Sequence, residues 1–252
     1  MEYPITTITN EKHGKRKLPS QFEEQVRPDL IKRAVVTIQK NNRQAYGAQP
    51  EAGQRQSAKL SRRRRDYKTS YGIGISRVPR KIMSRRGTRM NWVGAVAPGT
   101  VGGRRAHPPK SSKIIQVKIN NKERKKAIRS CLAATALRKD WPLIIEKKAE
   151  EIKTTKELKQ MLDKLGLHLR DEKKVRAGKG TKRGRRYKKS RGMLIVVSKE
   201  CSLEKAGRNL AGIEIREAKK LDAETLAPGC QVRPTIYTEE SLDVIEKEKL
   251  FT

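Results

Sequence analysis

Arginine occurs in clusters that are suited to binding phosphate. The run Arg62–Arg65 is followed by pairs of arginines at 85–86 and 104–105. A guanidinium group is planar and can donate two parallel hydrogen bonds to one phosphate, which a lysine ammonium cannot do. Tyr67 and Tyr71 lie close to the first run, and aromatic rings are the usual stacking partners of exposed nucleobases. These residue types point to a nucleic acid as the partner.

A second cationic run covers residues 173–191, which hold 11 basic residues and no acidic residue. It surrounds Tyr187 and leads directly into the apolar run at 194–197, so that a cationic loop would be tethered to a rigid strand. Runs of charge are usually only solvated surface, and Arg62–Arg65 alone fits a localisation signal or a solvated disordered run equally well. The run at 173–191 is internal, and its cations would repel one another when unbound. This repulsion favours contacts with phosphate over a solvated tail.

The residues expected to contact nucleic acid come from these two runs and from the basic positions between them. Gly102 and Gly103 are included because a chain without side chains can approach RNA closely. Trp92 fits either a small apolar cluster with Met90 and Val93 or a stacking platform, and we favour the cluster. The full set is Arg62, Arg63, Arg64, Arg65, Arg77, Arg80, Lys81, Arg85, Arg86, Arg89, Gly102, Gly103, Arg104, Arg105, His107, Lys110, Arg176, Lys179, Lys182, Arg183, Arg185, Arg186, Tyr187, Lys188 and Lys189.

Spacings that would support catalysis or a bound nucleotide are weak. The glycine-rich stretch 178–184 lacks the GxxxxGK[ST] pattern, and 72–74 is a lone GxG without a preceding strand. The three histidines have no spacing suited to a metal, and the three dispersed cysteines fit buried thiols better than a zinc site or a disulfide framework. We therefore expect no catalytic residue, no metal and no cofactor.

The positive charge is distributed unevenly along the 252 residues, whose formal net charge is +34. Residues 43–110 hold 17 basic and 2 acidic residues, whereas residues 193–252 hold 9 basic and 11 acidic. The first of these segments also contains half of the glycines, and its few branched aliphatic residues cannot build a core. Ordering it would cost on the order of 100 kcal/mol of conformational entropy. We expect it to be disordered alone, or ordered by an extensive anionic partner.

The flanking regions alternate between helical and strand patterns. Helices are expected from Arg27, from about 120 to 137, from 154 to 165, from 202 to 210 and from 239 to 250. Strands are expected at 143–145, 194–197, 213–215 and 235–237. This alternation predicts an α/β fold, with a mainly parallel sheet covered by helices. The expected globular domain consists of residues 1–42 and 111–252, with 43–110 inserted as a long basic extended loop and 173–191 as a basic segment within the domain.

Four stretches closely resemble the L-four family of large-subunit ribosomal proteins, in its archaeal and eukaryotic branch. They are Arg77–Arg80, Val101–Lys110 (VGGRRAHPPK), Asn121–Arg124 and Val175–Tyr187 (VRAGKGTKRGRRY). Residues 27–30 and 226–229 also fit, so the resemblance covers the chain from about Phe22. The departures from the family pattern lie in residues 1–20 and 138–172.

The resemblance implies a non-enzymatic, rRNA-binding constituent of the large ribosomal subunit that helps its assembly. In that family a globular α/β domain anchors a long loop that passes through rRNA to the wall of the nascent-peptide exit tunnel. Residues 43–110 would be this loop, which could span about 110 Å as a fully extended hairpin. Its tip is expected at Tyr67, Tyr71, Gly72, Ile73 and Gly74. The implied partners are rRNA, neighbouring ribosomal proteins including L-twenty-two, and the nascent peptide, in the cytoplasm.

Two other functions stay open at this point. A nucleic-acid-modifying enzyme on a Rossmann-like sheet would need a titratable cluster or a bound cofactor at the carboxyl ends of the strands. A regulator that binds its own messenger would use the same surface as a protein that binds rRNA. The first nine residues lack the features of a secretory signal, and no apolar stretch approaches the roughly 18 residues of a membrane span, so no membrane segment is expected.

Overall fold

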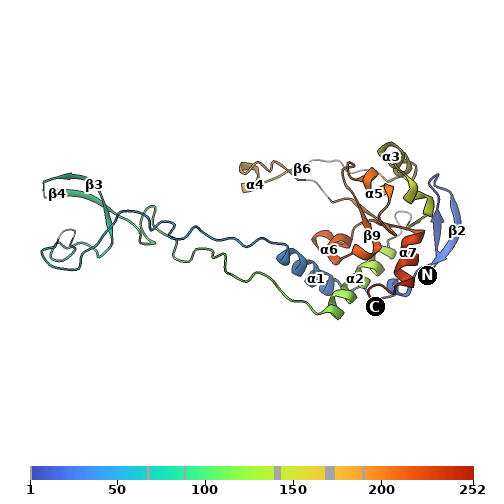
Figure 1. Cartoon of the computed structure of the whole chain (residues 1–252), viewed down its shortest axis with the longest axis horizontal. Helices are drawn as coiled ribbons and strands as arrows, with labels where there is room; N and C mark the ends of the chain where they lie inside the picture. Colours follow the sequence, from blue (N-terminus) through green and yellow to red (C-terminus); the bar gives the residue numbers. More distant parts are fainter. Residues whose placement is uncertain (1, 67–68, 88, 139–142, 168–173, 189–190) are drawn as a thin grey trace. The chain divides into compact units, whose positions relative to one another are not determined.

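The computed structural model describes residues 2–66, 69–87, 89–138, 143–167, 174–188 and 191–252. The chain divides into two compact units (Figure 1). Unit 1 consists of Met1–Asn42 and Gln116–Thr252, and unit 2 consists of Arg43–Ile115. Among the described residues, no helix is long and apolar enough to cross a membrane.

Unit 1 is built on a six-stranded sheet with the order β2-β1-β5-β10-β8-β9. These strands are β2 (Lys12–Lys17), β1 (Glu2–Thr6), β5 (Ile144–Ile145), β10 (Thr235–Thr238), β8 (Met193–Val197) and β9 (Ile213–Glu217). Only the β1–β2 pair is antiparallel, and the other four pairings are parallel. The predicted α/β fold with a mainly parallel sheet is therefore confirmed. The N-terminal pair β1–β2 was not predicted from the sequence.

Helices cover both faces of this sheet. One apolar cluster includes residues of α1 (Pro28–Asn41), α2 (Asn121–Ala136), α6 (Ala223–Leu226) and α7 (Glu239–Lys247), and the other includes residues of α3 (Thr155–Lys164) and α5 (Ser202–Gly207). Strand β8 feeds both clusters, because Leu194 and Val196 belong to the first while Ile195 and Val197 belong to the second. Side chains of a strand alternate between faces, so a strand with both faces covered must be apolar throughout.

The helix boundaries follow local capping. Pro28 occupies the first turn of α1, where its missing N–H costs nothing. The Thr154 hydroxyl accepts a hydrogen bond from the Glu157 N–H at 3.3 Å, which confirms this residue as the N-cap of α3. Helices α5 and α7 end at Gly207 and Lys247, three residues earlier than their apolar patterns predicted. Short 3₁₀ turns occur at η1 (Ser20–Phe22), η2 (Lys147–Glu151), η3 (Ala218–Lys220) and η4 (Pro228–Cys230).

Candidate nucleic-acid interface

The end of α1 and the segment that leads into α2 are joined close to the first and last residues of unit 2. Asn41, at the end of α1, donates from its side-chain amide to the Val117 carbonyl at 3.2 Å. The Asn41 side-chain oxygen accepts a hydrogen bond from the Val117 N–H at 2.9 Å. The Asn41 side chain thus pairs with both backbone groups of Val117, as a residue of a neighbouring strand would. This two-bond contact, which we call the neck, closes the insertion of residues 43–115.

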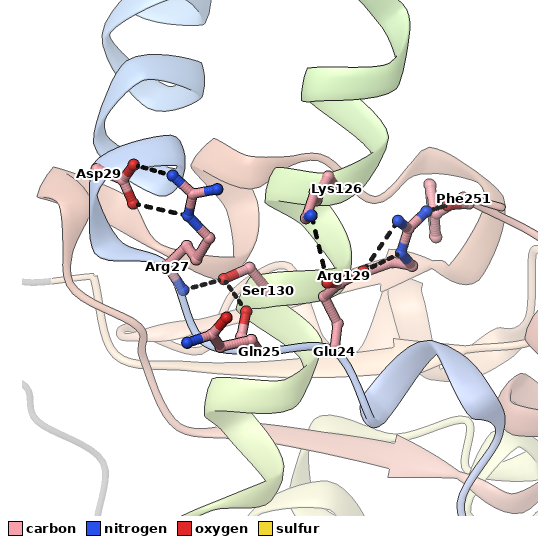
Figure 2. Close-up of polar contacts among 8 residues, drawn as sticks. All are labelled: Glu24, Gln25, Arg27, Asp29, Lys126, Arg129, Ser130 and Phe251. Atoms are coloured by element: carbon pink, nitrogen blue, oxygen red, sulfur yellow. Dashed lines mark hydrogen bonds and ion pairs between the residues drawn. The ribbon is translucent and has the colours of Figure 1, made fainter.

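A second set of contacts holds the start of α1 against α2 (Figure 2). The Ser130 hydroxyl accepts a hydrogen bond from the Arg27 N–H at 2.6 Å and donates to the Gln25 carbonyl at 3.2 Å. The Arg129 guanidinium bridges the Glu24 carboxylate, at 2.9 Å, and the Phe251 carbonyl, at 2.6 Å. Since Ser130 is completely buried, these bonds are shielded from water. Helix α1 is therefore held at both ends, at its start by Ser130 of α2 and at its end by Val117.

Unit 2 has its own backbone pairing. Its two arms are joined by a hydrogen bond from the Ala48 N–H to the Pro109 carbonyl at 2.8 Å and by one from the Gln56 amide to the Gly102 carbonyl at 2.9 Å. Strands β3 (Arg80–Arg86) and β4 (Arg89–Gly94) form an antiparallel hairpin that the sequence did not predict (Figure 1). The residues of this hairpin are mostly basic or polar and have little preference for a strand on their own. They form strands because β3 and β4 pair with each other.

The hairpin separates its side chains into two faces. Ile82 lies opposite Trp92, and the Arg80 guanidinium lies 5.5 Å from the centre of the Trp92 ring. Val93 is the cross-strand partner of Lys81 on the other face and is 44% exposed, so it does not pack beside Trp92 as we expected. The two faces alternate along a strand, which is why neighbouring residues cannot share a cluster. Trp92 is half-buried and pairs with Ile82 and arginine instead.

The run Arg62–Arg65 lies in a loop, and all four residues are exposed. The Arg77 guanidinium lies over the Tyr71 ring at 5.2 Å, and Ile73 is 56% exposed. Gly72 and Gly74 have φ values of +75° and +67°, the left-handed conformation that glycine adopts without strain. Of the residues predicted for the loop tip, Tyr67 lies outside the described residues. Lys59 and Arg80 form a bridge that brings the two ends of this loop together.

The stretch Val101–Lys110 contains a glycine, Gly103, that packing within unit 2 requires, whereas we expected glycine there to allow a close approach to RNA. A Cβ on Gly103 would lie 2.0 Å from the Ala97 carbonyl oxygen, so unit 2 itself requires glycine there. A Cβ on Gly102 would meet no atom within 4 Å. Arg104 is half-buried, whereas the other three predicted contact residues of this stretch, Arg105, His107 and Lys110, are exposed.

Residues 174–188, which we call the basic arm, form a small hairpin. Strands β6 (Lys174–Val175) and β7 (Tyr187–Lys188) pair antiparallel around the short helix α4 (Lys179–Lys182). Arg176 and Gly180 are half-buried, and the other residues of the arm are exposed. The Arg186 guanidinium lies 5.6 Å from the Tyr187 ring centre. Lys189, another predicted contact residue, lies outside the described residues.

The ion pairs found among the described residues lie outside unit 2 and the basic arm. Fourteen ion pairs have both partners among the described residues, and all of them lie in unit 1 outside the basic arm. Arg85 left aside, none of the described cations of the predicted set has a carboxylate of a described residue within 4.0 Å. Some cations of unit 1, among them Arg16, Arg129 and Arg233, are therefore paired with carboxylates of the protein, whereas the described cations of unit 2 and the basic arm, Arg85 left aside, are not.

Gln39, which precedes unit 2, and Arg191, which follows the basic arm, both contact Glu224. Glu224, on α6, accepts a hydrogen bond from the Gln39 side chain at 3.5 Å and lies 3.8 Å from the Arg191 guanidinium. Gln39 is in the last turns of α1, just before unit 2, and Arg191 follows the basic arm. No sequence pattern indicated these contacts, because the three residues are far apart along the chain.

The carboxyl ends of the parallel strands do hold a titratable cluster, as the enzyme alternative would require. Glu150 is buried, and its carboxylate accepts hydrogen bonds from the Ser198 N–H at 2.9 Å, the Ser198 hydroxyl at 2.6 Å and the Thr238 hydroxyl. Burial raises the pKa of the nearby Cys201 thiol, which disfavours a nucleophilic thiolate. The carboxylate is thus occupied in tying together strands β8 and β10. Within the described ranges, no group of histidine, cysteine and acidic residues could hold a metal ion.

Fold and surface together define an α/β protein in which the described cations of unit 2 and the basic arm, Arg85 left aside, form no ion pair with a described carboxylate, a charge distribution typical of proteins that bind polyanions. Residues 16–248 match the model of the ribosomal protein L4/L1 family. The chain is 43% identical to large ribosomal subunit protein uL4 of Nanoarchaeum equitans, over 100% of both chains. It is 39% identical to uL4 of Methanothrix thermoacetophila, over 98% of this chain and 99% of that one. The chain belongs to the ribosomal protein L4/L1 family.

Proposed function

We propose that this protein is a structural, non-enzymatic constituent of the large ribosomal subunit in the cytoplasm, which binds rRNA and helps the subunit to assemble. The observation that carries the proposal is the set of exposed arginines and lysines of unit 2 and the basic arm, which no described carboxylate neutralises, Arg85 left aside. Each such cation repels its neighbours until an anion approaches. Phosphates of a folded RNA supply that charge at close spacing, and each contact releases condensed counterions.

Unit 2 is the segment that would enter the RNA. It has few apolar residues to bury and many guanidinium groups, so an RNA surface supplies the contacts that a hydrophobic core cannot. By its family membership, we assign the loop at 60–75 and the β3–β4 hairpin to the wall of the nascent-peptide exit tunnel. The partners there would be protein L-twenty-two and the nascent peptide.

The test is RNA binding by the full chain as a function of salt. Substitution R183Q/R185Q/R186Q removes three unpaired cations of the basic arm. We expect the slope of log Kobs against log[KCl], for structured large-subunit rRNA, to fall by about 2 in magnitude, because each lost phosphate contact removes about 0.7 to 0.9.

The matched control is K156Q/K159Q/K164Q on α3, which removes the same charge from exposed lysines that make no ion pair with a described residue. Its slope should equal that of the unchanged protein. Equal slopes for all three proteins would contradict the proposal. Placement in the tunnel is tested separately by co-sedimentation with the large subunit and by crosslinks from residues 60–90 to rRNA and to a stalled nascent chain.

A further inference from the structure

The N-terminal hairpin presents a third set of unpaired cations, which the sequence patterns did not single out. Strand β2 lies at one end of the sheet and pairs only with β1 (Figure 1). Its residues are Lys-His-Gly-Lys-Arg-Lys, and all except Arg16 are exposed. The outer edge of β2 therefore carries backbone N–H groups that no neighbouring strand uses.

A bulge places three lysines on one face of this hairpin. Lys12, Lys15 and Lys17 lie opposite Thr6, Pro4 and Glu2, which are alternate residues of β1. Cross-strand partners point to the same side of a sheet, so the three lysines form one row. In a regular strand, residues three apart would point to opposite sides, and Lys12 would be separated from the others. The extra residue between the Pro4 and Thr6 pairings removes that separation.

The opposite face of the β1–β2 hairpin contacts other elements of unit 1. Arg16 pairs with Tyr3, and its guanidinium binds the Asp243 carboxylate and, at 2.8 Å, the Glu239 carbonyl of α7. The Tyr3 hydroxyl donates to the Ala136 carbonyl at 2.7 Å, so this face is packed on helices α2 and α7. The one cation of β2 that has protein partners is therefore the one that points inward.

The three lysines have no such partners. None of them lies within 4.0 Å of a carboxylate of a described residue, although Glu2 and Glu11 belong to the same hairpin. Edge strands often carry lysine only to prevent pairing with another chain. The other edge of this sheet provides a comparison, because β9 carries both signs of charge and Arg216 is paired with Glu214 at 3.0 Å. Protection of an edge does not require a row of unpaired cations.

We propose that Lys12, Lys15 and Lys17 bind the phosphate backbone of a further RNA segment, apart from the one bound by the basic arm. The inference rests on the proposed function. In the sheet order, β2 is separated from β8, which follows the basic arm, by three intervening strands. At about 4.8 Å per strand, β2 and β8 lie roughly 19 Å apart, so the row of lysines and the strand that follows the basic arm occupy separate places on the sheet. Unit 1 would thus hold RNA at both places.

The test uses the full chain with K12Q/K15Q/K17Q, measured against structured large-subunit rRNA over a range of KCl concentrations. We expect the magnitude of the salt slope to fall by about 2, and the affinity at 0.1 M salt to fall at least about tenfold. The variant K12R/K15R/K17R should keep the slope. K156Q/K159Q/K164Q on α3 is the control for loss of charge alone, and thermal unfolding checks that each variant is folded.

The outcomes separate this inference from the proposed function. If the unchanged protein shows no salt-dependent binding to rRNA, the proposed function itself fails. If it binds and the hairpin variant has the same slope as the α3 control, only the inference is overturned. If the hairpin variant self-associates in sedimentation while its slope is unchanged, the lysines protect the edge, and the inference is overturned as well.

Discussion

Arg233 is the residue where burial and charge oppose each other most directly. Its side chain is 4% exposed and donates to the Glu214 carboxylate at 2.8 Å. Burial lowers the pKa of Arg233, and the Glu214 carboxylate acts in the opposite direction. Burial alone would raise the pKa of Glu214, but hydrogen bonds from Arg233 and Arg216 lower it below its ordinary value. A carboxyl group of this kind stabilises the fold above its unfolded pKa of about 4.3, and the stabilisation is lost as the pH falls through the lower folded pKa.

Substitution R233M tests this pair. We expect the pKa of Glu214 to rise, because burial remains while its buried cationic partner is gone. The free energy of unfolding should fall by no more than about 3 kcal/mol at neutral pH, since Arg216 still binds the carboxylate. The loss of stability that Glu214 contributes on acidification should be smaller than in the unchanged protein, because its folded pKa moves closer to its unfolded pKa. NMR titration of the Glu214 side chain and thermal unfolding at several pH values measure both effects.

The control for R233M is R208M, which removes an exposed arginine whose ion pair with Glu204 spans one helical turn. Exposed pairs of this kind contribute little, so its unfolding should match that of the unchanged protein. An unchanged pKa of Glu214 in R233M would show that the buried pair does not set its titration.

At the scale of elements, the neck between α1 and the segment that leads into α2 is a single side chain. Asn41 is exposed, so its two hydrogen bonds to Val117 compete with water and contribute about 0.5 to 1.5 kcal/mol each. In N41A we expect the Val117 amide to exchange its hydrogen faster, while global stability changes by no more than about 2 kcal/mol. Hydrogen exchange followed by NMR measures this.

Substitution N41D is the matched control for N41A, because aspartate keeps the oxygen that accepts from the Val117 N–H and loses only the amide donor. Protection of that amide should be retained in N41D. If the Val117 amide exchanged equally in N41A and in the unchanged protein, the neck would not close the insertion in solution.

At the scale of the whole molecule, the described residues of unit 2 contribute nothing to the two apolar clusters of unit 1. Neither cluster contains a described residue between 43 and 115. Deletion of residues 55–95, with a short Gly-Ser linker in their place, should therefore shift the Tm of unit 1 by less than about 2 °C, since changes outside a core are usually within 0.5 kcal/mol. Differential scanning calorimetry of the deleted chain provides the measurement. A broad loss of cooperative unfolding would show that unit 1 depends on the inserted segment.

The sequence predicted those parts of the protein that have a local cause. Strand β8 was visible because a strand buried on both faces must be a continuous apolar run, and α3 because Thr154 caps it. The stretch Val101–Lys110 identified the family, and the family comparisons confirmed it. The contacts of individual cationic residues with RNA remain predictions.

The sequence could not predict elements that depend on a distant partner. Strand β2 consists of lysine, histidine, glycine and arginine, which do not favour a strand, and it exists because β1 pairs with it. The β3–β4 hairpin has the same origin. Trp92 was expected to form a cluster with Met90 and Val93. Val93 lies on the opposite face of β4 from Trp92, because adjacent residues of a strand point to opposite faces.

Composition and hydrophobic period, which any short window of this chain displays, were enough to determine the α/β class and the cationic segments, and motifs such as Val101–Lys110 were enough to indicate the family by resemblance. Tertiary structure alone decided which cations are neutralised, since Arg16 and Arg233 find acidic partners through folding and the lysines of β2 do not. It also decided that Gln39 and Arg191, which are far apart along the chain, both contact Glu224. The physical reason is that ion pairs and strand pairs join residues distant along the chain, and no local pattern encodes the partner.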